Sequence, residues 1–281
     1  MGWLRNCLGR VLPKSRFVRN VVTLAGGTAA GQVIMAVAVP IATRLYSPED
    51  YGILTVYASV ANLLLILASA RYELAVPVAK DDESAVNVLA LSAVFVGGMA
   101  LLAILAVLFA ADAIAAAAKL PGRSLYLWFL PLTIVCGGMY QVLNYWAVRI
   151  KRFGDIAKTK LTQSVGSNAT VIGLGFLHTG PAGLLLGTCV SYSAGTATLA
   201  KPLLTGDRKL LRAISWKRMR EQLHRYRRFP LLSTPAALLN NAAFSVPPIL
   251  LSSFYGTEVA GLYGLAMRIV GMPSVLVGTA I

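Results

Sequence analysis

The chain has 281 residues, of which 57% are hydrophobic and 13% are charged, and its formal net charge is +15. In a soluble protein this basic excess would indicate nucleic-acid binding, but so apolar a composition with long uncharged stretches indicates a membrane protein. We therefore expect no nucleic-acid partner.

Eight apolar stretches follow one another along the chain, each about as long as the twenty residues that a helix needs to cross a bilayer. They cover residues 21–43, 51–69, 84–111, 125–148, 161–177, 181–200, 229–254 and 259–281. Before them, residues 1–20 place leucines at helical spacing beside basic residues, as in an amphipathic helix lying on the inner leaflet. We expect an all-α bundle of about eight transmembrane helices.

Basic residues are concentrated in alternate connections between these stretches. With a cytoplasmic amino terminus, the inner segments are the tail 1–20, the connections 70–83 and 149–160, and the strongly basic loop 201–228. The outer connections hold only Arg44, Lys119 and Arg123. This is the distribution that the positive-inside rule requires, so we expect the amino terminus and the 201–228 loop to lie in the cytoplasm, next to membrane lipids.

A weak internal repeat divides the chain. Residues 46–57 and 255–266 align without a gap, which pairs Glu49 with Glu258 and Gly52 with Gly261. Both copies open a span on the outer side, so the repeat is parallel. We predict an N-terminal six-helix lobe at 21–200 and the start of a second lobe at 229–281, and we expect the sequence to be truncated because it stops two spans into that second lobe.

The start of the second span has a complete helix-capping pattern. Ser47 can accept a hydrogen bond from a free backbone amide, Pro48 suits the first helical position, and Glu49 and Asp50 complement the helix dipole. This pattern explains both carboxylates without a role in substrate contact.

Two further features limit the possible chemistry. The three cysteines form no disulfide framework, and no cluster of His, Cys, Asp or Glu has metal-ligand spacing. The sequence has no phosphate loop, dinucleotide fingerprint or nucleophile elbow. We therefore expect no cofactor, no metal ion and no enzyme activity.

Three motifs carry a resemblance to a known family: Leu24-Ala-Gly-Gly27 through Gly31-Gln32, the segment 40–52, and Arg71-Tyr-Glu73-Leu-Ala-Val-Pro77. They resemble the amino-terminal part of bacterial oligosaccharide flippases, the O-antigen and exopolysaccharide exporters of the multidrug/oligosaccharidyl-lipid/polysaccharide superfamily. The resemblance implies a two-lobed inner-membrane transporter that moves an undecaprenyl-diphosphate-linked oligosaccharide outward by alternating access. It also implies contact with glycan polymerase or export proteins.

Such a cargo requires cations for the diphosphate and hydrogen-bonding groups for the sugar hydroxyls. Arg268 is the clearest candidate, because a charge near the middle of a span is costly, although a structural pair is the alternative. Arg71 could receive the diphosphate, or it could be an anchor paired with Glu73. Arg44 could assist release, or it could be an interfacial charge.

Amide side chains inside the spans are weaker candidates for the cavity, with hydrogen bonding between helices as the alternative. They are Gln32, Asn62, Gln141, Asn144, Asn240 and Asn241.

Other functions remain possible at this point: a cation-coupled multidrug exporter of the same superfamily, a membrane-embedded glycosyltransferase or polymerase, and a non-transporting fragment. All eleven carboxylates lie in loops or near span ends, which favours an anionic cargo over cation coupling. The longest outer connection, 112–124, is short for the catalytic loop of a glycan-assembling enzyme.

Overall fold

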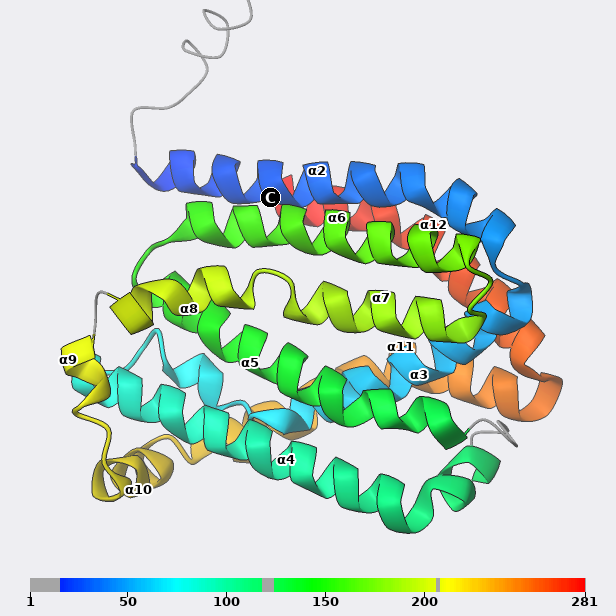
Figure 1. The fold of residues 1–281 in the computed structure, drawn as a ribbon. Coiled ribbons are helices and arrows are strands. Elements are labelled where there is room, and N and C mark those ends of the chain that lie inside the picture. Colours follow the sequence, from blue (N-terminus) through cyan, green and yellow to red (C-terminus); the bar gives the residue numbers. More distant parts are fainter. Residues whose placement is uncertain (1–15, 118–123, 206–207, 281) are drawn as a thin grey trace, which may run out of the picture.

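The computed structural model describes residues 16–117, 124–205 and 208–280, and every regular element in these ranges is helical. The long helices lie roughly along one direction and form a bundle (Figure 1). The predicted all-α class is confirmed. The helix predicted within residues 1–20 falls largely outside the described residues, as do Lys119 and Arg123. The long helices are α2 (Arg16–Leu45), α3 (Pro48–Ala68), α4 (Asp82–Ala117), α5 (Phe129–Arg149), α6 (Phe153–Phe176), α11 (Thr234–Tyr255) and α12 (Thr257–Ala280).

Shorter helices complete the chain between them. A 3-10 turn, η1 (Tyr72–Ala75), precedes α4, and a second one, η2 (Ser124–Trp128), precedes α5. The basic loop holds α9 (Arg208–Leu211) and α10 (Trp216–Arg225), and a π-helical turn, η3 (Phe229–Ser233), leads into α11.

Five described segments are long and apolar enough to cross a membrane, and they coincide with five of the predicted spans. They are Val22–Leu45, Pro48–Ala68, Asp82–Ala113, Leu125–Arg149 and Phe229–Tyr255. On α4, Leu101, Leu102, Leu108 and Phe109 point outward, with Phe109 86% exposed. An apolar face of this kind indicates contact with lipid rather than water.

The remaining three predicted spans lie on α6, on α7 (Pro181–Ser193) with α8 (Thr196–Thr205), and on α12. The predicted span 181–200 is in fact two helices, because the backbone turns at Gly195, whose φ of +90° favours glycine. The predicted span 161–177 is too short, since α6 begins at Phe153 and carries Lys158 and Lys160 within the helix.

The capping pattern before α3 forms as expected. The Asp50 amide donates to the Ser47 hydroxyl at 3.1 Å, and the Ser47 amide donates to the Asp50 carboxylate at 3.0 Å. This reciprocal capping satisfies amides that the first helical turn leaves free. It fixes the direction in which α3 enters the bundle.

Helices α3 and α12 pack closely at their amino-terminal ends, with α11 beside them (Figure 1). A β carbon on Gly52 would overlap the carbonyl oxygen of Thr257, and a β carbon on Gly261 would overlap that of Pro48. In the sequence repeat, Pro48 aligns with Thr257 and Gly52 with Gly261. The contact is therefore reciprocal, as in an interface between two symmetry-related copies. The division into two lobes stays a prediction.

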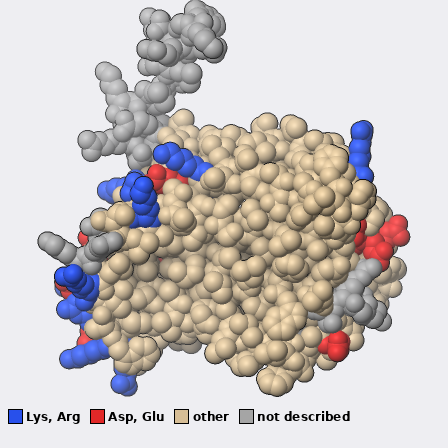
Figure 2. All heavy atoms as spheres, viewed as in Figure 1, with Lys and Arg blue, Asp and Glu red and all other residues tan. Residues whose placement is uncertain are grey.

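Lys and Arg side chains gather at the end of the bundle where α9 and α10 lie (Figure 2). The buried Asn87 of α4 holds this region in place: its amide nitrogen donates to the Ala213 carbonyl at 3.1 Å, and its oxygen accepts from the Ser215 amide at 3.0 Å. Arg218 of α10 also pairs with Glu83 of α4. The basic loop is thus held against α4 by the hydrogen bonds of Asn87 and by the ion pair of Arg218 with Glu83.

Arg149, at the end of α5, connects that helix to the segment between η1 and α4. Its guanidinium donates to the carbonyl oxygens of Val76 and Ala79, each at 2.9 Å, and to the Asp82 carboxylate at 2.9 Å. A planar group with several fixed donors is needed to reach all of these acceptors. Arg149 is therefore a structural cation at the basic end.

Candidate functional site

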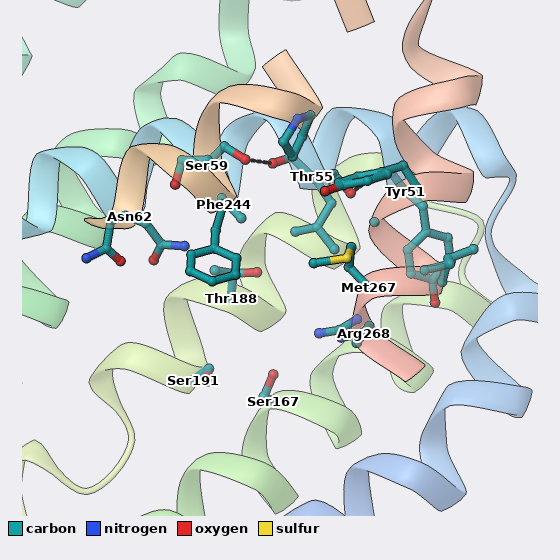
Figure 3. A pocket seen from close by; sticks show the side chains of 18 of the residues that line it. Tyr51, Thr55, Ser59, Asn62, Ser167, Thr188, Ser191, Phe244, Met267 and Arg268 are labelled. Atoms are coloured by element: carbon teal, nitrogen blue, oxygen red, sulfur yellow. Dashed lines mark hydrogen bonds between the residues drawn. The ribbon is translucent and has the colours of Figure 1, made fainter. Parts of the chain in front are cut away.

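A cavity of about 550 Å³ is lined by α3, α11 and α12, and α6 and α7 also contribute to it (Figure 3). Helix α3 contributes Tyr51, Thr55, Ser59 and Asn62, which share one helical face because they are spaced by four or three residues. The walls of the cavity thus come from helices that are far apart in the sequence, from α3 to α12.

The α3 wall is polar, and its side chains already have hydrogen-bond partners. Thr55 donates to the Tyr51 carbonyl at 2.7 Å, and Ser59 donates to the Thr55 carbonyl at 2.8 Å. The Asn62 oxygen accepts from the Tyr192 hydroxyl of α7 at 3.2 Å. Because these hydroxyl protons are bonded, the oxygen lone pairs of Thr55 and Ser59 remain available to accept from a ligand.

Arg268 provides the charge of the cavity. It lies at the middle of α12, and its side chain reaches toward the space that Ser167 of α6 and Thr188 of α7 face (Figure 3). Within the described ranges, Arg268 is the one charged residue that lines this cavity, and it makes no ion pair or hydrogen bond with another described residue. A guanidinium in this situation can bind an anion in bidentate fashion.

Four of the sequence candidates meet at this place. Arg268, Asn62 and Asn241 line the cavity, and the Asn241 amide nitrogen also donates to the Ala237 carbonyl at 2.9 Å. Gln32 lines a smaller hollow between α2 and α6, which Arg268 also borders. Their roles stay predictions, but the fold brings them together.

The structure places Arg71 and Glu73 away from the cavity, in the turn that follows α3. The Arg71 backbone has a φ of +60°, and its guanidinium lies 3.9 Å from the Glu73 carboxylate. Glu73 is 1% exposed, accepts a hydrogen bond from Ser69, and has its pKa raised by burial. This arrangement favours the anchor alternative over a place in the cavity.

Four other candidates also lie outside the cavity. Arg44 is exposed at the end of α2, and Asn240 is exposed on α11. Gln141 and Asn144 lie on α5, where the side-chain oxygen of Asn144 is buried without a hydrogen-bond partner in the described structure. The sequence alone could not separate these residues from Asn62 and Asn241, because helical periodicity does not say which neighbours a face meets.

Several cavity residues were not among the candidates, notably Ser167, Thr188 and Ser191. Serine and threonine are common inside membrane helices because they bond to their own backbone, so no sequence pattern distinguished these three residues. Together with Arg268 and the α3 wall, they form a site with one cation, several hydroxyls and amides. Such a set can bind an anionic group and the hydroxyls attached to it.

Comparison with known protein families gives a match over most of the chain. The sequence model of a family described as polysaccharide biosynthesis protein matches residues 41–281. No curated protein and no solved structure matches the chain. The matched range includes α3, α6, α7, α11 and the described part of α12, and therefore every residue that lines the cavity.

Proposed function

The chain belongs to the family of polysaccharide biosynthesis proteins, and we propose that it is a flippase for lipid-linked oligosaccharide. Its cargo would be an undecaprenyl-diphosphate-linked oligosaccharide, carried across the bacterial inner membrane for export as O-antigen or exopolysaccharide. The observation that carries this proposal is the cavity in which Arg268 meets no carboxylate of the described residues. Membrane lipids and glycan polymerase or export proteins are the partners expected for such a transporter.

The position of Arg268 supports binding of the diphosphate. Arg268 is eleven residues from Thr257, the first residue of α12, which corresponds to about 16 Å along a helix. This is close to the middle of a hydrocarbon core that is about 30 Å thick. A cation at such a depth is costly unless it meets an anion or water. The planar fork of arginine matches the oxygens of a phosphate group.

The remaining cavity walls suit the sugar part of the cargo. Thr55, Ser59 and Asn62 on α3, with Thr188 and Ser191 on α7, offer hydroxyl and amide groups. The cavity volume of about 550 Å³ lies within the range of pockets that hold small ligands. These groups would replace the water that sugar hydroxyls lose on leaving the aqueous phase.

The carboxylates of the described residues lie away from this cavity, which argues against a cation-coupled multidrug exporter. Among the described residues that line this cavity, none is Asp or Glu. A cation-coupled multidrug exporter needs buried carboxylates as ion sites, whereas an anionic cargo is repelled by them. The cavity therefore supports transport of an anion.

The location of the cavity also supports alternating access. It is lined both by α3 and by the pair α11 and α12, which the repeat assigns to different lobes. The reciprocal contact of Gly52 with Thr257 and of Gly261 with Pro48 closes one end of this boundary. In the predicted orientation that end faces outward, so separation of α3 from α12 would open the cavity to the outside.

The test replaces Arg268 in the native gene and measures surface glycan display in a flippase-deficient strain. Arg268→Ala should abolish most display, and Arg268→Lys should keep part of it, because lysine keeps the charge but not the fork. Arg220→Ala, on the exposed face of α10, is the matched control and should not change display. Variants are compared at equal membrane levels. Full display with Arg268→Ala would exclude this role for Arg268.

A further inference from the structure

A second polar hollow lies between α2 and α6, with a volume of about 180 Å³. Gln32 lines it from α2, and Lys160, Gln163 and Asn168 line it from α6. It shares Arg268 with the main cavity. We call it the α2–α6 recess. An anion at Arg268 would therefore stand at the junction of the two hollows.

Lys160 is a second cation at this site, at a different depth from Arg268. It is seven residues from Phe153, the first residue of α6, or about 10 Å along the helix. Ser167, which borders both hollows, is a further seven residues along α6, again about 10 Å. Lys160 therefore lies between Arg268 and the basic end of the bundle.

Lys160 has no carboxylate partner in the described structure. The nearest acidic residue on α6, Asp155, pairs with Arg152 at 2.6 Å and lies 3.9 Å from the Lys158 ammonium. The Lys160 ammonium lies 5.4 Å from the centre of the Tyr140 ring, a cation–π contact that adds no negative charge. The positive charge of Lys160 is therefore available to a ligand in the recess.

Gln163 provides a neutral donor beside this cation. It is one turn after Lys160, on the same face of α6, and its side chain lines the recess with only 9% of the residue exposed. In the described structure it makes no hydrogen bond. Its amide atoms are not sealed off from the recess, so the amide nitrogen can donate to a ligand that enters it.

We propose that Lys160 and Gln163 form a second oxyanion site, on the cytoplasmic side of Arg268. The ammonium neutralises a phosphate or carboxylate group, and the amide nitrogen donates to one of its oxygens. The inference rests on the proposed function, since it assumes an anionic cargo in the main cavity. Two sources of the oxyanion fit this chemistry. One is the diphosphate of the lipid carrier on its way to Arg268. The other is the carboxylate of an acidic sugar in a cargo whose diphosphate is already bound at Arg268.

Direct binding tests the site. The purified full-length protein in lipid nanodiscs is titrated calorimetrically with two probes: farnesyl diphosphate, a short polyprenyl diphosphate, and a disaccharide that contains glucuronate. Lys160→Gln should weaken the binding of at least one probe by about tenfold or more, as expected for loss of a charged hydrogen bond. Gln163→Leu should weaken the same probe several-fold, and Lys160→Arg should keep the affinity within about threefold of the unaltered protein.

The matched control is Lys158→Gln, which removes the same charge from the same helix. Lys158 is 76% exposed and lies near Asp155 rather than in the recess, so its loss should not change either affinity. Circular dichroism checks that each variant is folded. A loss confined to farnesyl diphosphate identifies the diphosphate as the source, and a loss confined to the disaccharide identifies an acidic sugar.

Failure of this inference can be separated from failure of the proposed function by including Arg268→Ala. If Arg268→Ala abolishes binding while Lys160→Gln behaves like Lys158→Gln with both probes, the recess is not an oxyanion site and the proposed function stands. If Lys160→Arg binds as weakly as Lys160→Gln, the role of Lys160 is not its charge, and the inference is also overturned. If the unaltered protein binds neither probe, both proposals fail.

Discussion

The contact between α3 and α12 makes a quantitative prediction for Gly52→Ala. In an ordinary helix interior this change stabilises a protein by about 0.5–1 kcal/mol. At Gly52 the added methyl group would overlap the backbone carbonyl of Thr257, which cannot rotate away, and such overpacking costs about 1–3 kcal/mol. We therefore expect a net loss of about 1–2 kcal/mol, or a few degrees in Tm for a chain of this size.

The assay is thermal unfolding of the purified protein in detergent, followed by circular dichroism. The control is Gly98→Ala on α4, where a β carbon would meet no atom within 4 Å, and this change should leave Tm equal or raised. In the double variant Gly52→Ala with Gly261→Ala, the decrease in Tm should be smaller than the sum of the two single decreases. The first methyl group already pushes α3 and α12 apart, so the second methyl group meets less overlap. Equal Tm values for Gly52→Ala and Gly98→Ala, or strict additivity in the double variant, would refute the proposed reciprocal packing.

Two further predictions concern the basic end of the bundle. Arg149→Lys should lower the free energy of unfolding by about 1.5–3 kcal/mol, because an ammonium cannot reach all of the acceptors that the guanidinium binds. The control Lys151→Gln, at an exposed neighbouring position, should change the free energy of unfolding by less than about 0.5 kcal/mol. Equal effects of the two changes in thermal unfolding would contradict the structural role of Arg149. Lys217→Cys, in the basic loop, should resist a membrane-impermeant thiol reagent in intact cells that lack other reactive cysteines, and labelling there would reverse the predicted orientation.

The sequence predicted most of the helical frame because long apolar runs and capping signals are local. The capping box at Ser47 and the five apolar spans appear where the pattern placed them. The boundary of α6 was missed because Lys158 and Lys160 were taken as the end of a span, whereas the helix begins at Phe153. The break at Gly195 was missed because nothing in an apolar run requires a glycine to adopt positive φ.

The candidate site was harder to predict, because it depends on which helix faces meet. Arg268 could be chosen from its charge and depth alone. Gln141 and Asn62 carry similar side chains in similar runs, but only Asn62 faces the cavity. Gln163 and Lys160 could be identified as site candidates only from the packing of α2 against α6, which forms the recess that they line. Long-range packing is the information that periodicity lacks.

The polarity of α6 has a consequence for the biogenesis of the protein. This helix carries two lysines, amides and several hydroxyls, and it is not among the described segments that are apolar enough to cross a membrane. The translocation machinery accepts a segment into lipid according to its own apparent free energy of insertion. We therefore expect α6 to enter the bilayer by pairing with α2, its neighbour in the bundle. More than a hundred residues lie between the two helices in the sequence, so insertion of α6 would have to wait until these residues have been synthesised.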